Sequence, residues 1–191
     1  EIPIRLISGS SSFYQFELVL CLLFCEFTLQ NPSEDLDTAS GFWNRNAYKS
    51  MVAAEFLVQK PFILIGISIE NLSIIRKTLG SGNIETLIYH VGEFTKELSG
   101  HAVLFRTDND SLVIMIPNTD DSGKFAEQIK KKFAEAWKLD DQEIILYAHI
   151  CLLECPKYAQ DVAETLRLIS LMTRQARNQG KDIITMAEMD I

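Results

Sequence analysis

The chain has 191 residues, 47% of them hydrophobic, and its 26 acidic against 18 basic side chains give a formal net charge of −8. This length is enough for one globular domain with its own core, and 23% charged residues with 5 Pro and 9 Gly exclude a mainly disordered or fibrous chain. The acidic balance argues against nucleic acid as a partner, because binding its backbone needs clustered Lys and Arg.

The chain starts with Glu1 rather than Met, so we expect it to be part of a longer protein. Residues 13–29 are its most apolar stretch, but two glutamates limit the uncharged run to eight residues, well below the about 20 that a membrane span needs. Two interpretations stay open: a helix that packs against a partner or its own domain, or the inner end of a membrane helix. We therefore divide the chain into an N-terminal apolar segment with a linker, residues 1–36, and a main domain, residues 37–191.

The main domain alternates helical and strand patterns. The predicted elements are a helix at 44–58, a strand at 62–69, helices at 71–79 and 84–98, strands at 102–106 and 112–116, a helix that includes Phe125, Ile129, Phe133 and Trp137, a strand at 143–153, a helix at 158–178 and a strand at 182–185. The near-continuous apolar run at 62–69 is typical of a central strand that is covered on both faces. The polar sequence Thr-Asp-Asn-Asp-Ser at 107–111 predicts the turn of a hairpin. This order predicts an elaborated ferredoxin-like α/β domain, in which a mixed central sheet is flanked by helices.

Four cysteines form two pairs with the same spacing, Cys21 with Cys25 and Cys151 with Cys155. Neither spacing is the Cys-x-x-Cys of a redox or zinc site. On a strand, Cys151 and Cys155 would lie roughly 13 Å apart, which is too far to share a small ion. We interpret the cysteines as buried thiols of a reduced, intracellular protein.

One segment carries a specific resemblance. Residues 37–48, Asp-Thr-Ala-Ser-Gly-Phe-Trp-Asn-Arg-Asn-Ala-Tyr, resemble the opening motif of diguanylate cyclase (GGDEF) domains. Arg106 before the hairpin, Pro117 after it and the segment 176–181, Ala-Arg-Asn-Gln-Gly-Lys, also match the family pattern. The resemblance covers residues 37–187 and implies the nucleotide-cyclase type of ferredoxin-like fold.

The resemblance also implies a chemistry, which this sequence lacks the residues to perform. Active family members join two GTP molecules into cyclic di-GMP with metal ions held by carboxylates at the end of the first strand and in the G-G-D-E-F hairpin. Here these two positions are Ser68 and Ser111, the two glycines are Asp108 and Asn109, and only Asp110 keeps its family identity. Magnesium prefers anionic oxygen ligands. We therefore expect no bound metal, no other cofactor and no catalytic residues of a cyclase.

Five further positions correspond to nucleotide-binding residues of the family. Arg76 and Lys77 stand where the resemblance places a guanine-binding Asn and its neighbouring Asp, and Glu85 keeps an acid at the second guanine-binding position. Arg177 and Lys181 keep positive charge where the family binds phosphate. The dipole at the end of a helix also explains cations at these two positions.

Our leading hypothesis is a degenerate GGDEF-like signalling domain that acts as a dimerisation, regulatory or partner-binding output module of a larger bacterial receptor. We expect it to be cytoplasmic, with a protein partner or a second copy of the chain, and a membrane contact through the upstream region stays open. Two alternatives remain. One is a weakly active diguanylate cyclase that holds magnesium with a relocated carboxylate set, Glu70, Asp108 and Asp110, and the other is a sensor that binds GTP without turnover.

Overall fold

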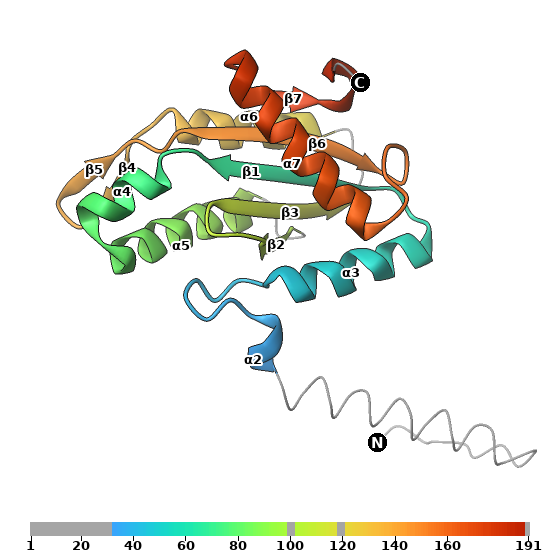
Figure 1. The fold of residues 1–191 in the computed structure, drawn as a ribbon, viewed down its shortest axis with the longest axis horizontal. Coiled ribbons are helices and arrows are strands. Elements are labelled where there is room, and N and C mark those ends of the chain that lie inside the picture. Colours follow the sequence, from blue (N-terminus) through green and yellow to red (C-terminus); the bar gives the residue numbers. More distant parts are fainter. Residues whose placement is uncertain (1–31, 99–101, 118–120, 190–191) are drawn as a thin grey trace, which may run out of the picture. The chain divides into compact units, whose positions relative to one another are not determined.

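The computed structural model describes residues 32–98, 102–117 and 121–189. The unit Asp35–Ile191 has a five-stranded mixed sheet with helices on both of its faces, which confirms the predicted α/β fold (Figure 1). The apolar stretch 13–29, with Cys21 and Cys25, lies outside the described residues. Every helix in the described ranges falls short of the length and apolarity that crossing a membrane requires. The division at residue 36 stays a prediction.

The helices and strands follow the predicted order, with an added hairpin and two short helices, α2 and η1, that were not predicted. They are α2 (Pro32–Asp35), α3 (Arg45–Val58), β1 (Phe62–Ile69), α4 (Leu72–Leu79), α5 (Ser81–Leu98), β2 (Val103–Arg106), β3 (Ser111–Pro117), α6 (Ser122–Phe133), β4 (Trp137–Leu139), β5 (Gln142–Ile144), β6 (Ala148–Cys155), α7 (Val162–Gln179), β7 (Ile183–Thr185) and the short 3-10 helix η1 (Met186–Glu188).

The strand β1 is the centre of the sheet. The strand order is β2-β3-β1-β6-β7, and all neighbours are antiparallel except the parallel pair β6 and β7. Each of the eight residues of β1 is buried, as its unbroken apolar pattern predicts for a strand covered on both faces. The end of β1 therefore lies between β3 and β6, inside the sheet rather than at an edge.

Alternate residues of β1 belong to two separate hydrophobic cores. Its four isoleucines pack with residues of α5 and α6, whereas Phe62 and Leu64 pack with residues of α3 and α7. Figure 1 shows α7 in front of the sheet and α6 behind it. Gly66 and Ser68 continue the face that carries α3 and α7, because side chains alternate along a strand.

Gly66 lets α7 approach the sheet closely. A Cβ atom at Gly66 would lie 2.5 Å from Cγ2 of Ile169 and 2.8 Å from Sγ of Cys151, both shorter than real contacts of a Cβ atom. The close contact at Gly66 holds α7 against β1 three residues before the strand ends at Ile69. The next residue on the same face, Ser68, therefore lies beside the C-terminal half of α7, where Arg177 contacts it.

Two predicted elements are wrong, and two helices start elsewhere than predicted, α5 at Ser81 rather than 84 and α7 at Val162 rather than 158. Trp137 does not continue the helix of Phe133; it begins β4, and its buried ring packs edge-on against Phe94 and at a tilt against Phe133. The predicted strand 143–153 is two strands, because β5 pairs with β4 in a separate small sheet while β6 joins β1. The turn between β4 and β5 contains Asp140 with a φ of 51°, a left-handed conformation that Asp tolerates better than most residues.

Candidate functional site

Ser68 and Ser111 are partners across the sheet. The antiparallel register of β1 and β3 sets them directly opposite each other at the open end of both strands, where side chains of paired residues lie on one face. The backbone N–H of Ile69 donates a 2.9 Å hydrogen bond to the carbonyl oxygen of Asp110, so the hairpin is fixed to the end of β1. Both serines line a cavity of about 380 Å³. The structure thus brings together the two positions that the family resemblance assigns to metal ligands.

The hairpin between β2 and β3 presents its polar side chains to solvent. Asp108 accepts a 2.8 Å hydrogen bond from the backbone N–H of Asn109, and Ser111 Oγ donates a 3.0 Å hydrogen bond to Asp110 Oδ1. Asp108 and Asp110 line the cavity on its hairpin side, whereas Asn109 does not line it. Hydrogen bonds within the turn therefore engage one oxygen, Oδ1, of each of these two carboxylates.

The two positions that the family resemblance assigns to magnesium ligands carry no carboxylate here. Mg²⁺ is held in proteins by carboxylates in a nearly octahedral oxygen shell, and these positions carry neutral hydroxyl groups instead, so that the acidic side chains at the cavity are Asp108 and Asp110 of the hairpin. Within residues 32–98, 102–117 and 121–189, no group of three or more His, Cys, Asp or Glu side chains is arranged to hold a metal ion.

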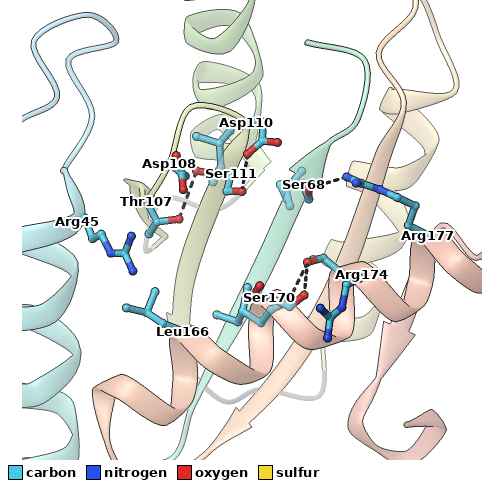
Figure 2. A pocket seen from close by; sticks show the side chains of 14 residues that line it. Arg45, Ser68, Thr107, Asp108, Asp110, Ser111, Leu166, Ser170, Arg174 and Arg177 are labelled. Carbon is cyan, nitrogen blue, oxygen red and sulfur yellow. Dashed lines mark hydrogen bonds between the residues drawn. The ribbon is translucent and has the colours of Figure 1, made fainter. Parts of the chain in front are cut away.

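The Arg177 side chain reaches the serine pair from α7. Its Nη2 lies 3.4 Å from Ser68 Oγ (Figure 2). Its Nε lies 3.8 Å from Glu70 Oε1. Glu70 also contacts Nε2 of His149 at 3.3 Å, and it does not line the cavity of the serine pair. Lys181 makes a 3.0 Å ion pair with Glu188 outside this cavity. Of the two basic residues expected at the phosphate position, only Arg177 lies at the cavity.

Two arginines for which the sequence analysis assigned no function also line the cavity. Asn44 caps α3 by accepting hydrogen bonds from the backbone N–H groups of Asn46 and Ala47, which sets Arg45 in the first helical turn. Arg174 lies one turn before Arg177 on α7, and Figure 2 shows both helices contributing to one site. The spacing of three residues on α7 is a signal for a shared face, but the sequence gives no sign that α3 lies opposite.

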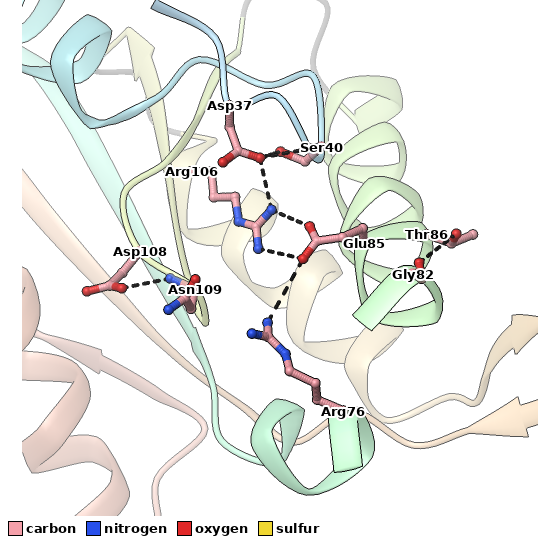
Figure 3. Close-up of polar contacts among 9 residues, drawn as sticks. All are labelled: Asp37, Ser40, Arg76, Gly82, Glu85, Thr86, Arg106, Asp108 and Asn109. Atoms are coloured by element: carbon pink, nitrogen blue, oxygen red, sulfur yellow. Dashed lines mark hydrogen bonds and ion pairs between the residues drawn. The ribbon is translucent and has the colours of Figure 1, made fainter. Parts of the chain in front are cut away.

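The positions expected to bind guanine form an ion-pair network instead. Arg106 lies between Asp37 and Glu85, and Arg76 approaches Glu85 from α4 (Figure 3). Arg106 contacts Asp37 Oδ1 at 2.9 Å and binds Glu85 through both of its terminal nitrogens, while Arg76 lies 4.0 Å from Glu85. Glu85 is therefore occupied by two guanidinium groups. Lys77, in the last turn of α4, is exposed and lies outside this network.

Burial and hydrogen bonding shift the pKa values of Asp37 and Arg106 in opposite directions. Burial would raise the pKa of Asp37, but hydrogen bonds from Ser40 and the Arg106 guanidinium hold it below the ordinary value of 3.8. Burial would lower the pKa of Arg106, but Glu85 and Asp37 raise it above its ordinary value. Both charges are consequently retained at neutral pH, and the pair joins the segment before α3 to the strand β2.

Comparisons with known proteins give one family. Residues 34–183 match the family model described as diguanylate cyclase, GGDEF domain. No curated protein sequence matches the chain.

Solved structures with a similar fold come from the same family. A diguanylate cyclase/phosphodiesterase from Caldicellulosiruptor saccharolyticus is 17% identical with a TM-score of 0.70, over 82% of this chain and 96% of that one. The diguanylate cyclase SiaD from Pseudomonas aeruginosa, solved in complex with its activator SiaC, is 12% identical with a TM-score of 0.70, over 91% of this chain and 74% of that one. The FimX GGDEF domain from the same organism is 14% identical with a TM-score of 0.69, over 79% of this chain and 98% of that one. At these identities the similarity shows the fold alone.

Proposed function

Because this chain belongs to the diguanylate cyclase GGDEF domain family, we propose that it is a member without cyclase activity that serves a larger signalling protein as a regulatory module. The observation that carries the proposal is the pairing of Ser68 with Ser111 across β1 and β3. Phosphoryl transfer to a hydroxyl group depends on cations that screen the triphosphate and stabilise the charge of the transition state. Two hydroxyl groups supply none of the negative charge that would hold such cations.

The ion-pair network on the other side of the hairpin supports the same proposal. A guanine base offers N–H donors that an acid can accept, but Glu85 already accepts from Arg106 and lies beside Arg76. Moving Glu85 to a ligand would leave the Arg106 guanidinium, whose side chain is 5% exposed, with Asp37 as its remaining acidic partner. Breaking a buried pair in this way costs several kcal/mol. Productive guanine binding in the family's manner is therefore unfavourable here.

As a regulatory module, the domain would act through a protein partner or through a second copy of itself. Among proteins of the same fold, SiaD was solved in complex with a protein activator, and another GGDEF domain was solved in a complex with cyclic di-GMP. We propose a protein contact of this kind for the present domain, in the cytoplasm, with any membrane attachment supplied by upstream sequence.

A direct assay tests the proposal. The purified protein is incubated with GTP and Mg²⁺ or Mn²⁺, and products are separated by ion-exchange chromatography. We expect no cyclic di-GMP above the level of a protein-free control. Formation of cyclic di-GMP that disappears in Asp110→Ala would refute the proposal and would favour the relocated carboxylate set.

A variant designed to gain metal binding tests whether Ser68 and Ser111 occupy the family's ligand positions. Four substitutions, Ser68→Asp, Ser111→Glu, Asp108→Gly and Asn109→Gly, restore the family's ligands and glycines on an unchanged scaffold. Titration calorimetry of this variant with Mn²⁺ is expected to show binding that the wild type lacks, because two facing carboxylates recreate an oxygen ligand pair. Equal Mn²⁺ binding by both proteins would contradict the assignment of Ser68 and Ser111 to the ligand positions.

A further inference from the structure

The cavity beside the serine pair has cations that no acidic side chain neutralises. Arg45 from α3 and Arg174 from α7 line it, and neither makes an ion pair within the described ranges. Arg177, the third arginine, has only the 3.8 Å contact with Glu70 and the 3.4 Å contact with Ser68. Three guanidinium groups around one cavity repel one another, and an anion between them would remove that repulsion.

The carboxylates of the cavity lie on a different wall. Asp108 and Asp110 belong to the hairpin, whereas the arginines come from the helices α3 and α7 (Figure 2). Each of these carboxylates accepts a hydrogen bond within its own hairpin, from the N–H of Asn109 or the hydroxyl of Ser111. The half of the cavity between the two helices is therefore the positive half.

A second cavity extends this positive half along the helices. It has a volume of about 540 Å³ and shares Arg45 and Leu166 with the first cavity. Its remaining lining includes the apolar Val162 and the cations Lys49 and Arg167, of which Arg167 lies 3.6 Å from Glu164. Lys49 follows Arg45 by four residues, which sets both on one face of α3. We call these two neighbouring cavities together the α3–α7 groove; five basic and two acidic residues line it, in a chain whose net charge is −8.

We infer that the α3–α7 groove binds an organic phosphate without a divalent metal. The phosphate groups would bind between Arg45, Arg174 and Arg177, and the organic part would lie over Leu166 and Val162 in the second cavity. Guanidinium groups match phosphate with paired, charge-assisted hydrogen bonds. In this inference arginine supplies the charge that metal ions supply in active family members, so it rests on the proposed absence of a magnesium site.

The ion-pair network at Arg106 indicates the direction in which the organic part of a bound ligand would extend. That network includes Glu85, where the family resemblance places a guanine-binding acid, since Glu85 binds Arg106 and lies 4.0 Å from Arg76. Arg76, Glu85 and Arg106 line neither cavity of the groove, whereas Val162, Ala163 and Leu166 give the second cavity an apolar part. A ligand anchored by its phosphates would therefore extend toward α3 and away from α4.

Titration calorimetry in buffer with EDTA tests the inference. The probes are inorganic tripolyphosphate, ATP and GTP, and we expect all three to bind without metal and to bind more weakly as ionic strength rises. Arg174→Ala, at an exposed position, is expected to weaken binding of each probe about tenfold, as the loss of one charge-assisted hydrogen-bonding group predicts. Lys138→Ala on the distant strand β4 is the matched control and should leave binding unchanged.

The position of the organic part has its own test. Ala163 is exposed, lines the second cavity and lies in the first turn of α7, so Ala163→Gln fills part of this cavity without changing charge. We expect it to weaken ATP and GTP several-fold more than tripolyphosphate. An equal effect on all three probes, or none, would overturn this placement.

Two outcomes separate this inference from the proposed function. No binding of tripolyphosphate in EDTA, or binding that Arg174→Ala leaves intact, would overturn the metal-free phosphate site while the domain could still lack cyclase activity. Formation of cyclic di-GMP with magnesium would overturn the proposed function, whatever the arginines bind.

Discussion

Replacing Arg106 by Met should destabilise the domain strongly, because it leaves two partly buried carboxylates without their main partner. The Arg106 side chain is 5% exposed, and those of Asp37 and Glu85 are 28% and 22% exposed. Removing one partner from a buried pair costs about 3–5 kcal/mol. Since Ser40 still donates to Asp37 and Arg76 lies near Glu85, we expect the lower end, about 3 kcal/mol. For a domain of this size that corresponds to a fall in Tm of about 10 °C.

Urea unfolding at neutral pH, followed by circular dichroism and tryptophan fluorescence, measures this loss. Lys124→Met is the matched control, since Lys124 pairs with Asp121 at 2.7 Å but both side chains are largely exposed, at 81% and 74%. An exposed ion pair is screened by solvent and contributes little to stability. If Arg106→Met lowers the unfolding free energy no more than Lys124→Met does, the ion pairs of Arg106 with Asp37 and Glu85 do not stabilise the fold.

The pH dependence of the same variant gives a second check. The pKa of Asp37 lies below its ordinary value of 3.8 in the folded protein, so its stabilising contribution is present above about pH 4 and is lost as the pH falls through the lowered pKa. Arg106→Met removes a guanidinium that lowers this pKa. The difference in unfolding free energy between wild type and variant should therefore stay constant from pH 7 to about pH 5 and narrow below about pH 4. A difference that widens in acid would show that another group dominates.

Three other changes test the packing around the sheet. A Cβ atom at Gly92 would lie 2.0 Å from Cζ of Phe42, so Gly92→Ala should lower the unfolding free energy, measured in urea, by about 2 kcal/mol. The control Gly123→Ala places its Cβ atom in open space on α6 and should leave the unfolding free energy unchanged or raise it. Tyr48→Phe removes a 2.7 Å hydrogen bond to the buried Thr165 hydroxyl and should cost about 1–2 kcal/mol, a loss that equal stability of the two proteins would contradict. Burial raises the pKa of the Cys151 thiol to about 12. At neutral pH this thiol should therefore react with a disulfide reagent only after the protein unfolds. Rapid reaction of the native protein would argue against the burial of this thiol.

The central part of the fold follows from local patterns in the sequence. The apolar run of β1 and the polar turn at residues 107–111 predict the strand and the hairpin, and both occur where expected. Trp137 is different, because its four-residue spacing from Phe133 fits a helix as well as it fits a ring that folds back onto the same core. The turn that redirects this chain contains Asp140 and lacks the glycine that usually marks a hairpin.

The candidate site was predictable only where residues lie close in sequence or follow the family motif. Ser68 and Ser111 could be named from the motif, and the register of β1 and β3 places them together. The ion pair between Glu85 and Arg106 could not be predicted from the sequence, because it joins α5 to the strand β2. The meeting of Arg45 with Arg174 likewise depends on how α3 packs beside α7, which neither helix encodes alone.

The serine pair limits what a single substitution could achieve. Ser68 and Ser111 are paired across the sheet with the Arg177 guanidinium beside Ser68. A carboxylate at residue 68 alone would form an ion pair with that arginine instead of holding a cation. A cation site at this pair would therefore need carboxylates on both neighbouring strands.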